Sequence, residues 1–357
     1  MQGCKSERKQ STNLNYIPET LARGGSMLSC APVDKVLFQG GRAIGVTGRF
    51  KHPQTGATGA AFTARAKKAV IIAASATHSP ALLRRSGLRH RAVGAWFRAH
   101  PGTGVFGLYP EVVDTNVGVT QGWSSSHFRT SEGFKIETLS IPMEMAISRF
   151  SGGGRAFMEK LKHYRHVAMW CHALRARSPG RVYAGFGGKP LVHYSLDRDD
   201  MLRFRQGMLR VAELHFAAGA RAVIPGIAGL PFSLERHELD QLAGAPLDPR
   251  AYVAILSHLF GGCVMGADDS KAVCDTKGQV YGRKGLWVAD ASLMRTISAS
   301  TRSIRSWPWP CRSRPRSCTP RPEWLSPSGA AAGAAPAEDR ADLRTGRCCC
   351  SPCSGPP

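Results

Sequence analysis

His258 begins the segment His-Leu-Phe-Gly-Gly-Cys-Val-Met-Gly, which contains the residue types in this chain that are best suited to chemistry. An imidazole has an ordinary pKa of about 6.5, so it can accept or release a proton at neutral pH. The pair Gly261-Gly262 lacks side chains, which would let the backbone approach a flat ligand closely. Most histidines in proteins are structural, but this context favours His258 as a general base.

Asp290 is the second residue that the pattern singles out. It follows the apolar run Leu-Trp-Val-Ala of residues 286–289, which is typical of a strand. Because α/β proteins place ligand contacts at the carboxyl ends of strands, we expect Asp290 to contact a ligand. A plain structural role is the alternative.

A strand followed by a short helix is expected over residues 69–88. The run of small and apolar residues at 69–74 predicts a strand that is buried on both faces. Ser79 suits the N-cap of the following helix, Pro80 its first turn and Gly87 its C-terminal end.

The remaining elements are predicted from hydrophobic spacing and turn residues. Strands are expected over residues 33–38, 42–46, 62–65, 105–108, 117–121, 134–139, 182–186 and 191–194. Helices are expected over residues 16–24 and 157–169, and from a cap at Asp199 or Asp200 to a stop at Gly219. Strands that are grouped together, with one strand-turn-helix unit, predict an α/β fold with an α+β insertion.

Three motifs resemble those of the glucose-methanol-choline (GMC) oxidoreductases, which are FAD-dependent alcohol oxidases and dehydrogenases, and they occur in the same order as in that family. The segment that starts at His258 is similar to the cholesterol oxidase and long-chain alcohol oxidase branches. Residues 75–88 match the second signature of the family and depart from it only at Arg89, where glycine is usual. Residues 288–292, Val-Ala-Asp-Ala-Ser, resemble the strand that enters the flavin site. The resemblance covers about residues 3–296.

The resemblance implies FAD as cofactor and assigns roles to several residues. His258 would accept the alcohol proton while the hydride moves to flavin N5. Asp290 and Ala291 would lie against the ribityl chain and ring, Val33 would meet the adenine, and Ala74 would approach the dinucleotide. For Val33 and Ala74, core packing is an equally good interpretation. No metal site is expected.

The resemblance also implies a division into domains. Residues 1–103 would be part of a Rossmann-like FAD-binding domain, residues 104–247 a substrate domain with an antiparallel sheet, and residues 248–297 the return of the chain to the FAD-binding domain. Bulky apolar side chains in the insertion suit either a pocket for an apolar alcohol or ordinary core: Phe106, Phe128, Met143, Met145, Phe150 and Trp170. The sequence does not identify the electron acceptor.

The composition bounds the other classes of function. The 357 residues include 48 Lys and Arg against 25 Asp and Glu, for a formal net charge of +23. This excess keeps open an alternative, a basic module that binds nucleic acid or an anionic surface. The charges are scattered, however, so no nucleic-acid partner is expected. No run of apolar residues is long enough for a transmembrane segment, and no signal peptide is evident, so a cytoplasmic location is expected.

Both ends of the sequence depart from the family pattern. The Gly-x-Gly-x-x-Gly unit between a strand and a helix, which seats the FAD pyrophosphate, is not recognised, so we expect an N-terminally truncated fragment with weak FAD binding and little activity. After Met294 the family continues with Pro-Thr, a few residues and then Val-Asn-Pro, whose Asn (or a His in its place) is the second catalytic residue. One permitted choice of codons for residues 297–311 restores Val-Asn-Pro when it is read with a one-base shift. We therefore expect a frameshift near Ile297.

The C-terminal segment, residues 298–357, is then expected to be out of frame and disordered. It is rich in Pro, Arg and Ser, and it holds six of the 11 cysteines. The cluster at residues 348–353 lacks paired Cys-x-x-Cys spacing and a nearby histidine, so zinc is not favoured. The five earlier cysteines, an odd number without close pairing, are expected to be reduced thiols: Cys4, Cys30, Cys171, Cys263 and Cys274.

Overall fold

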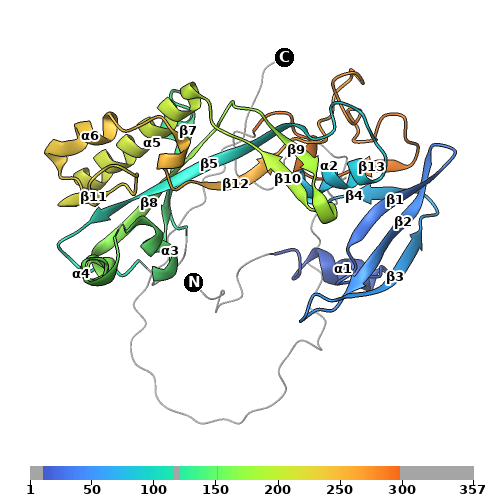
Figure 1. The fold of residues 1–357 in the computed structure, drawn as a ribbon, viewed down its shortest axis with the longest axis horizontal. Coiled ribbons are helices and arrows are strands. Elements are labelled where there is room, and N and C mark those ends of the chain that lie inside the picture. The colour runs from blue at the N-terminus through green and yellow to red at the C-terminus, as the bar shows by residue number, and fades with distance from the viewer. Residues whose placement is uncertain (1–10, 116–120, 151, 298–357) are drawn as a thin grey trace, which may run out of the picture. The chain divides into compact units, whose positions relative to one another are not determined.

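The computed structural model describes residues 11–115, 121–150 and 152–297. After helix α1 (Tyr16–Ala22), strands β1 (Val33–Gln39), β2 (Arg42–Lys51) and β3 (Thr58–Arg65) form an antiparallel sheet in that order (Figure 1). The strands predicted over residues 33–38 and 42–46 are confirmed, and they form a hairpin with Gln39 opposite Arg42 across a two-residue turn. Gly40 and Gly41 both have positive φ, of 54° and 77°, which is the conformation that this turn type requires.

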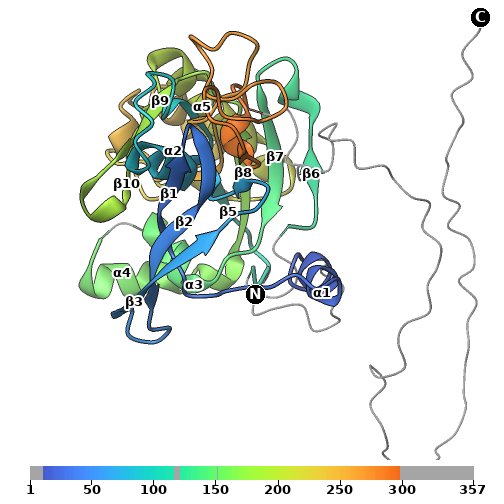
Figure 2. The ribbon, with the colours of Figure 1, turned by 90° about the vertical axis from the view of Figure 1, so that its right-hand side faces the viewer.

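A small parallel sheet joins two segments that are far apart in the sequence. Strand β4 (Val70–Ile72) pairs with β13 (Leu286–Val288), and Val288 lies opposite Ile72. Helix α2 (Ser75–Arg85) follows β4 directly and packs against β1, where the Val36 backbone N–H donates to Ser86 Oγ at 2.9 Å (Figure 2). One apolar core is shared by the two sheets and α2: Val36, Val70, Ile72, Leu82, Leu83, Leu286 and Val288.

The start of α2 differs from the sequence prediction. The helix begins at Ser75, so Pro80 lies inside it and not in its first turn. Ser79 does not cap the helix; its Oγ accepts from the Ala74 backbone N–H and donates to Asp290. The C-terminal end was predicted correctly, because Gly87 adopts a φ of +89° just beyond the helix.

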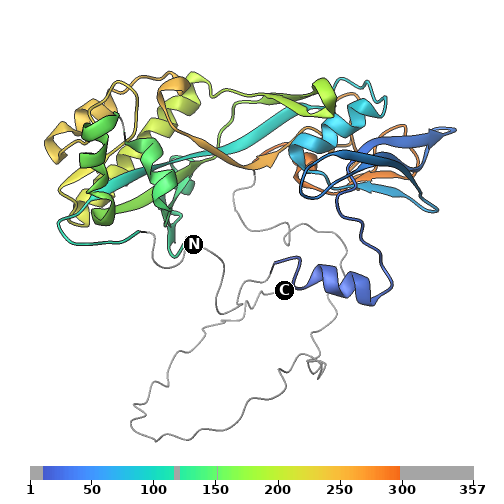
Figure 3. The same ribbon diagram turned by 60° about the horizontal axis from the view of Figure 1, so that its bottom comes forward.

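The long strand β5 (Ala95–Leu108) is the centre of an eight-stranded antiparallel sheet (Figure 3). The strand order is β10-β9-β5-β8-β7-β6, and β11 and β12 also pair with β5. The bounds of the other strands are β6 (Ser124–Ser125), β7 (Phe134–Leu139), β8 (Val167–Leu174), β9 (Gly180–Ala184), β10 (Pro190–His193), β11 (Ala222–Ile224) and β12 (Ile255–Phe260).

Helix α5 (Arg198–Ala217) packs on β5 and β8 and buries the largest core. Its apolar positions recur at helical spacing, and they include Met201, Phe204, Met208 and Val211. Its N-cap is Asp197, whose side chain accepts from the Asp200 backbone N–H, and not Asp199 or Asp200 as predicted. The shorter helices are α3 (Met143–Ala146), α4 (Gly154–Leu161) and α6 (Leu239–Ala243).

The predicted helix over residues 157–169 was wrong in its second half. Helix α4 ends at Leu161, and strand β8 begins at Val167. Buried residues of β8 lie on both faces of the sheet: His172 and Leu174 pack on the side of α5, whereas Val167 and Met169 belong to the core on the opposite side. The predicted strand over residues 117–121 falls almost wholly outside the described residues, as does the predicted C-terminal segment.

The observed fold is mixed α/β with an antiparallel sheet inserted between its parallel strands, as the sequence predicted. The proposed domain boundaries stay a prediction. Four of the five early cysteines lie in the described part of the chain, and all four are free thiols. Within the same residues, no helix is both long enough and apolar enough to cross a membrane.

Candidate functional site

His258 stands out from the strand that carries it. The pairing of β12 with β5 shifts register between Ser257 and Leu259, so His258 is the extra residue of a β-bulge. Its φ is +53°, a strained value for a residue with a side chain. The residue is exposed to solvent, but part of its imidazole is covered by neighbouring side chains of the sheet. Strain of this kind, held by a rigid sheet, is characteristic of functional positions.

The imidazole of His258 is surrounded by polar and aromatic groups of the large sheet. Its ring meets the His100 ring edge to face, with ring centres 5.5 Å apart. Burial lowers the pKa of His258, the positive charge of Lys135 lowers it further, and Glu137 opposes both effects. A lowered pKa keeps the imidazole neutral at neutral pH, which is the form that can accept a proton.

Lys135 and Glu137 lie on one face of β7 and form an ion pair of 2.5 Å, with both side chains largely buried. Cross-strand register places Lys135 in a row with Ala173, Gly102 and finally Ile255 on β12. The two middle residues of this row, Ala173 and Gly102, have small side chains or none. The surface of the sheet between the charged pair and β12 is therefore not covered by bulky side chains. Sequence reasoning missed Lys135 and Glu137, although their alternation in a predicted strand was visible.

Asp290 links the ends of the two parallel strands. One carboxylate oxygen accepts from the Ser75 backbone N–H at 2.9 Å and from Ser79 Oγ at 2.5 Å, and the other accepts from the Ser292 backbone N–H at 2.8 Å. Ser75 has a φ of +86°, which aims its N–H at this carboxylate. Asp290 therefore holds the turn after β4 against the end of β13.

Three of the four residues with a predicted FAD contact lie together. Ala74 and Asp290 are at the carboxyl ends of the two parallel strands. The carbonyl of Ala291 accepts from the Gly261 backbone N–H at 3.2 Å, which brings the segment after His258 to the same place. Val33 lies elsewhere.

Val33 is at the far end of α2. Its carbonyl accepts from Arg85 Nη2 at 3.4 Å, and its side chain packs against the core that the two small sheets share. Helix α2 runs from Ser75 to Arg85, which is about 16 Å at 1.5 Å per residue. The structure therefore places Val33 apart from Ala74 by the length of this helix.

The glycine pair serves a different purpose from the one expected. A Cβ on Gly261 would lie 1.9 Å from the Trp96 carbonyl oxygen, and one on Gly262 would lie 2.9 Å from Pro80 Cγ. Both glycines are buried. The expectation that they leave room for a flat ligand was wrong, because protein atoms of β5 and α2 occupy that space.

The spacing Gly102-x-Gly104-x-x-Gly107 does occur in the chain, but it lies within strand β5. A Cβ on Gly104 would meet the Met169 side chain at 2.2 Å, and one on Gly107 would meet His215 Nδ1 at 2.3 Å. These glycines make room for neighbouring side chains of the antiparallel sheet. They do not form the turn between a strand and a helix that binds a pyrophosphate.

The bulky apolar side chains of the insertion are mainly core. Phe106 and Phe150 are buried in the core between the sheet and helices α3 and α4. Phe128 and Trp170 pack against the core under α5, and Trp170 stacks on His215. Met143 and Met145 are exposed, at 45% and 48%. The core interpretation is thus correct for four of the six, and they give no support to an apolar alcohol.

The described residues fit part of FAD. The carboxyl ends of β4 and β13 present small exposed residues, among them Ala73, Ala74, Ser75 and Ala289, which leave space for a planar ring and its ribityl chain. Ile71 in β4 is 65% exposed, although a parallel sheet is normally covered on both faces. Asp290 Oδ1 accepts only one hydrogen bond from the described residues, so it can accept another.

The described residues thus combine a two-stranded parallel sheet with an antiparallel sheet that lies between its strands in the sequence and carries a strained histidine, which is a mixed α/β architecture. Comparison with known proteins is more specific. Residues 1–102 match the N-terminal profile and residues 178–304 the C-terminal profile of the GMC oxidoreductases. The chain belongs to the GMC oxidoreductase family, whose members bind FAD.

The chain spans about half the length of the curated relatives that it matches. It is 33% identical over 293 residues to an uncharacterized GMC-type oxidoreductase of Mycobacterium tuberculosis, covering 82% of this chain and 45% of that protein. It is 26% identical over 343 residues to an oxygen-dependent choline dehydrogenase of Pseudomonas putida, covering 82% and 56%. The structure of pyridoxine 4-oxidase from Mesorbium loti has a TM-score of 0.55 at 17% identity, covering 76% and 53%, which shows a shared fold.

Proposed function

We propose that the described residues form the substrate side and the flavin-ring side of an FAD-dependent oxidoreductase that acts on the CH–OH group of an alcohol. The observation that carries this proposal is the position of His258, an exposed imidazole with a lowered pKa on a strained bulge. Backbone contacts link the segment after it to Ala291, beside Asp290. Membership of the GMC family supports the proposal over a basic module that binds nucleic acid or an anionic surface.

In this function His258 accepts the hydroxyl proton of the alcohol. Neutral imidazole is the required form, and both burial and Lys135 favour it. Asp290, Ala291 and Ala74 would hold the ring and ribityl end of FAD, and Val33, at the other end of α2, would lie towards the adenine. FAD supplies an acceptor for the hydride that leaves the carbinol carbon.

Two finer proposals go with this function. We expect FAD to bind weakly, since no Gly-x-Gly-x-x-Gly turn between a strand and a helix was recognised in the sequence. We also keep the hypothesis of a one-base shift near Ile297, which concerns residues beyond those described. The nucleotide sequence decides it: codons that do not encode Val-Asn-Pro in the shifted frame contradict it.

The function is tested with the full chain and an excess of FAD. Flavin fluorescence measures FAD binding, and the loss of flavin absorbance under anaerobic conditions measures alcohol oxidation. We expect slow reduction that falls about 100-fold or more in His258→Gln, the usual contribution of a general base. His237→Gln is the matched control, because His237 is exposed and pairs only with Glu235 at 3.6 Å among the described residues. Reduction that is unchanged in His258→Gln contradicts the proposal.

A further inference from the structure

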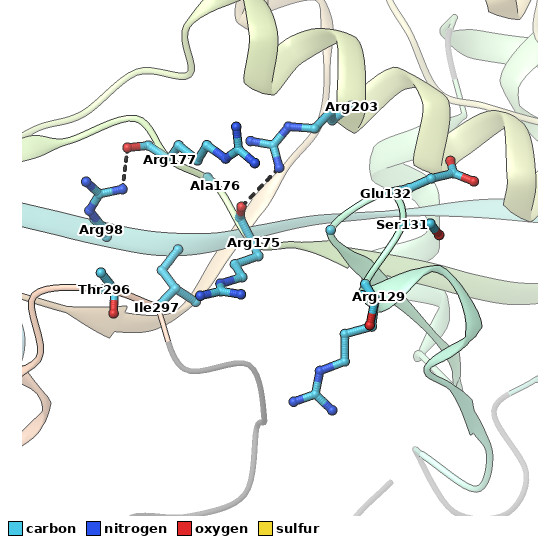
Figure 4. A pocket seen from close by; sticks show the side chains of 12 residues that line it. Arg98, Arg129, Ser131, Glu132, Arg175, Ala176, Arg177, Arg203, Thr296 and Ile297 are labelled. Carbon is cyan, nitrogen blue, oxygen red and sulfur yellow. Dashed lines mark hydrogen bonds between the residues drawn. The ribbon is translucent and has the colours of Figure 1, made fainter.

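A cavity of about 280 Å³ lies at one end of the large sheet, and five of its twelve lining residues are arginines. Arg98 comes from β5, Arg175 and Arg177 follow β8, Arg203 comes from α5, and Arg129 ends the turn before β7 (Figure 4). Two other cavities of the described residues gather less charge of one sign: one is lined by Arg149 and Arg250, and the other by Arg283 and Lys284 together with Asp275.

Most of this positive charge is not neutralised. Arg203 forms an ion pair with the buried carboxylate of Asp200, which accounts for one of the five guanidinium groups. Glu132, the only acidic residue that lines the described cavity, is 3.5 Å from Arg210 Nε, outside the cavity. The side chains of Arg129 and Arg175 have no hydrogen bond or ion pair with any described residue.

Hydrogen bonds to the buried carboxylate of Asp200 fix the segment that carries Arg177. The Arg177 backbone N–H and Ser178 donate to Asp200, which fixes the chain after β8 while the Arg177 side chain stays exposed and unpaired among described residues. Arg98 donates to the Arg177 carbonyl through Nη1, and its Nε is buried without a hydrogen-bond partner in the described residues. A donor that is buried without an acceptor indicates a place for a ligand oxygen.

The cavity lies next to the candidate base along the sheet. Arg98 is two residues before His100 on β5, so both side chains lie on one face, about 7 Å apart along the strand. His100 is opposite Ser257 and meets the ring of His258. Gly102 is opposite Ala173, so Arg175 leaves β8 at the end of the sheet where His100 lies on β5.

We propose that this arginine cavity binds the anionic group, a carboxylate or a phosphate, of an alcohol whose hydroxyl reaches His258. The inference rests on the proposed function and specifies its substrate class. Guanidinium groups bind both oxyanions through paired N–H donors, whereas an apolar alcohol would leave Arg129, Arg175 and Arg177 without a counter-charge among the described residues. Arg98 and His100 are about 7 Å apart along β5, and the His258 ring lies beyond His100, so the anionic group and the hydroxyl of such an alcohol must be separated by several carbon atoms.

The test measures binding to the full chain without FAD, by calorimetry. The probes are ω-hydroxyhexanoate, n-hexanol and inorganic phosphate. We expect the hydroxy acid to bind about tenfold or more tightly than n-hexanol, and Arg175→Gln to weaken hydroxy acid and phosphate by about tenfold. Arg155→Gln is the control, since Arg155 is an exposed arginine on α4, outside the cavity, and its side chain has no ion pair with any described residue.

A second readout follows His258 itself by NMR of labelled histidine, with its signal assigned from His258→Gln. We expect ω-hydroxyhexanoate to shift this signal and inorganic phosphate to leave it in place, because only the hydroxy acid reaches both groups. Equal binding of the hydroxy acid and n-hexanol, or equal effects of Arg175→Gln and Arg155→Gln, would overturn the proposal. Anion binding that is lost in Arg175→Gln, in a chain that never reduces FAD, would instead leave the cavity assigned and refute the enzymatic function.

Discussion

Two buried histidines lie between helix α5 and the large sheet, His172 on the sheet and His215 on the helix. Replacing them should change the free energy of unfolding in opposite directions at neutral pH, but it should reduce the acid sensitivity of that free energy in both cases. His172 on β8 is 1% exposed, and neither ring nitrogen has a hydrogen-bond partner among the described residues. His215 on α5 is equally buried, but its Nδ1 lies 3.0 Å from Tyr109 Oη and its Nε2 lies 3.0 Å from the Val105 carbonyl oxygen. The comparison separates the cost of an unpaired polar group from the benefit of a paired one.

The substitutions are His172→Leu and His215→Leu, measured near pH 7.5. An unpaired buried polar group costs about 1–3 kcal/mol, so His172→Leu should leave the free energy of unfolding unchanged or raise it by up to about 2 kcal/mol after the loss of ring contacts with Phe204. His215→Leu should lower it by about 1–3 kcal/mol, because Tyr109 and the Val105 carbonyl lose their partner.

Acid adds a second, independent signature. Burial lowers the pKa of His172 to about 3 and that of His215 to about 4. Since both folded-state values lie below the ordinary value of about 6.5, the unfolded chain takes up protons first as the pH falls. The free energy of unfolding is therefore not reduced by protonation of these histidines above about pH 6.5. Below that pH each histidine lowers it by about 1.4 kcal/mol per pH unit, until the folded-state pKa is reached.

Urea unfolding followed by tryptophan fluorescence, at about pH 7.5 and about pH 4.5, measures both effects. Between these two pH values, the fall in the free energy of unfolding should be smaller in each variant than in the unmodified chain. The difference should be about 3 kcal/mol for His172→Leu and slightly smaller for His215→Leu. The reasoning fails if His172→Leu destabilises the chain by more than about 1 kcal/mol near pH 7.5, or if either variant keeps the full acid sensitivity.

Two further predictions concern the candidate site. Gly261→Ala should lower the free energy of unfolding by at least about 2 kcal/mol more than Gly41→Ala, because both glycines have nearly the same φ, 76° and 77°, but only a Cβ on Gly261 meets a backbone oxygen. Equal losses in urea unfolding would show that the close approach is relieved at no cost. Lys135→Met should raise the pKa of His258 and Glu137→Gln should lower it, since these charges act on the imidazole in opposite directions. An NMR titration of labelled histidine that gives the same direction for both variants would contradict this arrangement.

Local patterns predicted the elements that position the site. Residues 69–74 and 286–289 were expected to be strands, and the structure pairs β4 and β13 in parallel with Asp290 at the carboxyl end. These predictions depend on apolar runs and on side-chain alternation, which are properties of neighbouring residues. The turn at Gly40-Gly41 was predictable for the same reason, because its geometry needs positive φ at both positions.

The errors arose where long-range contacts decide the structure. Pro80 is compatible with the first turn of a helix, but the bond from Ser75 N–H to Asp290, 215 residues away, sets the start of α2 earlier. Gly261 and Gly262 suggested room for a ligand, yet their neighbours are Trp96 and Pro80 from other elements. No sequence window contains those partners.

The charged part of the site was missed for a related reason. Alternation showed that Lys135 and Glu137 share a face of their strand, but it could not show that their charges act on His258, which comes from another strand of the sheet. The strained φ of His258 is likewise a consequence of the bulge in β12, which depends on pairing with β5. Residue type was enough to predict His258 as the base, but the groups around it depend on how the strands of the sheet are paired.

The central claim is that His258 is the base in alcohol oxidation beside FAD, and the pH dependence of flavin reduction tests it most directly. The rate constant for anaerobic reduction of excess FAD by ω-hydroxyhexanoate is measured with the full chain and with His258→Gln. Since the pKa of His258 is lowered, the rate should fall only below about pH 6.5, and His258→Gln should lower the plateau about 100-fold or more and abolish this acid limb. An acid limb that persists in His258→Gln, or an unchanged plateau, would contradict the account.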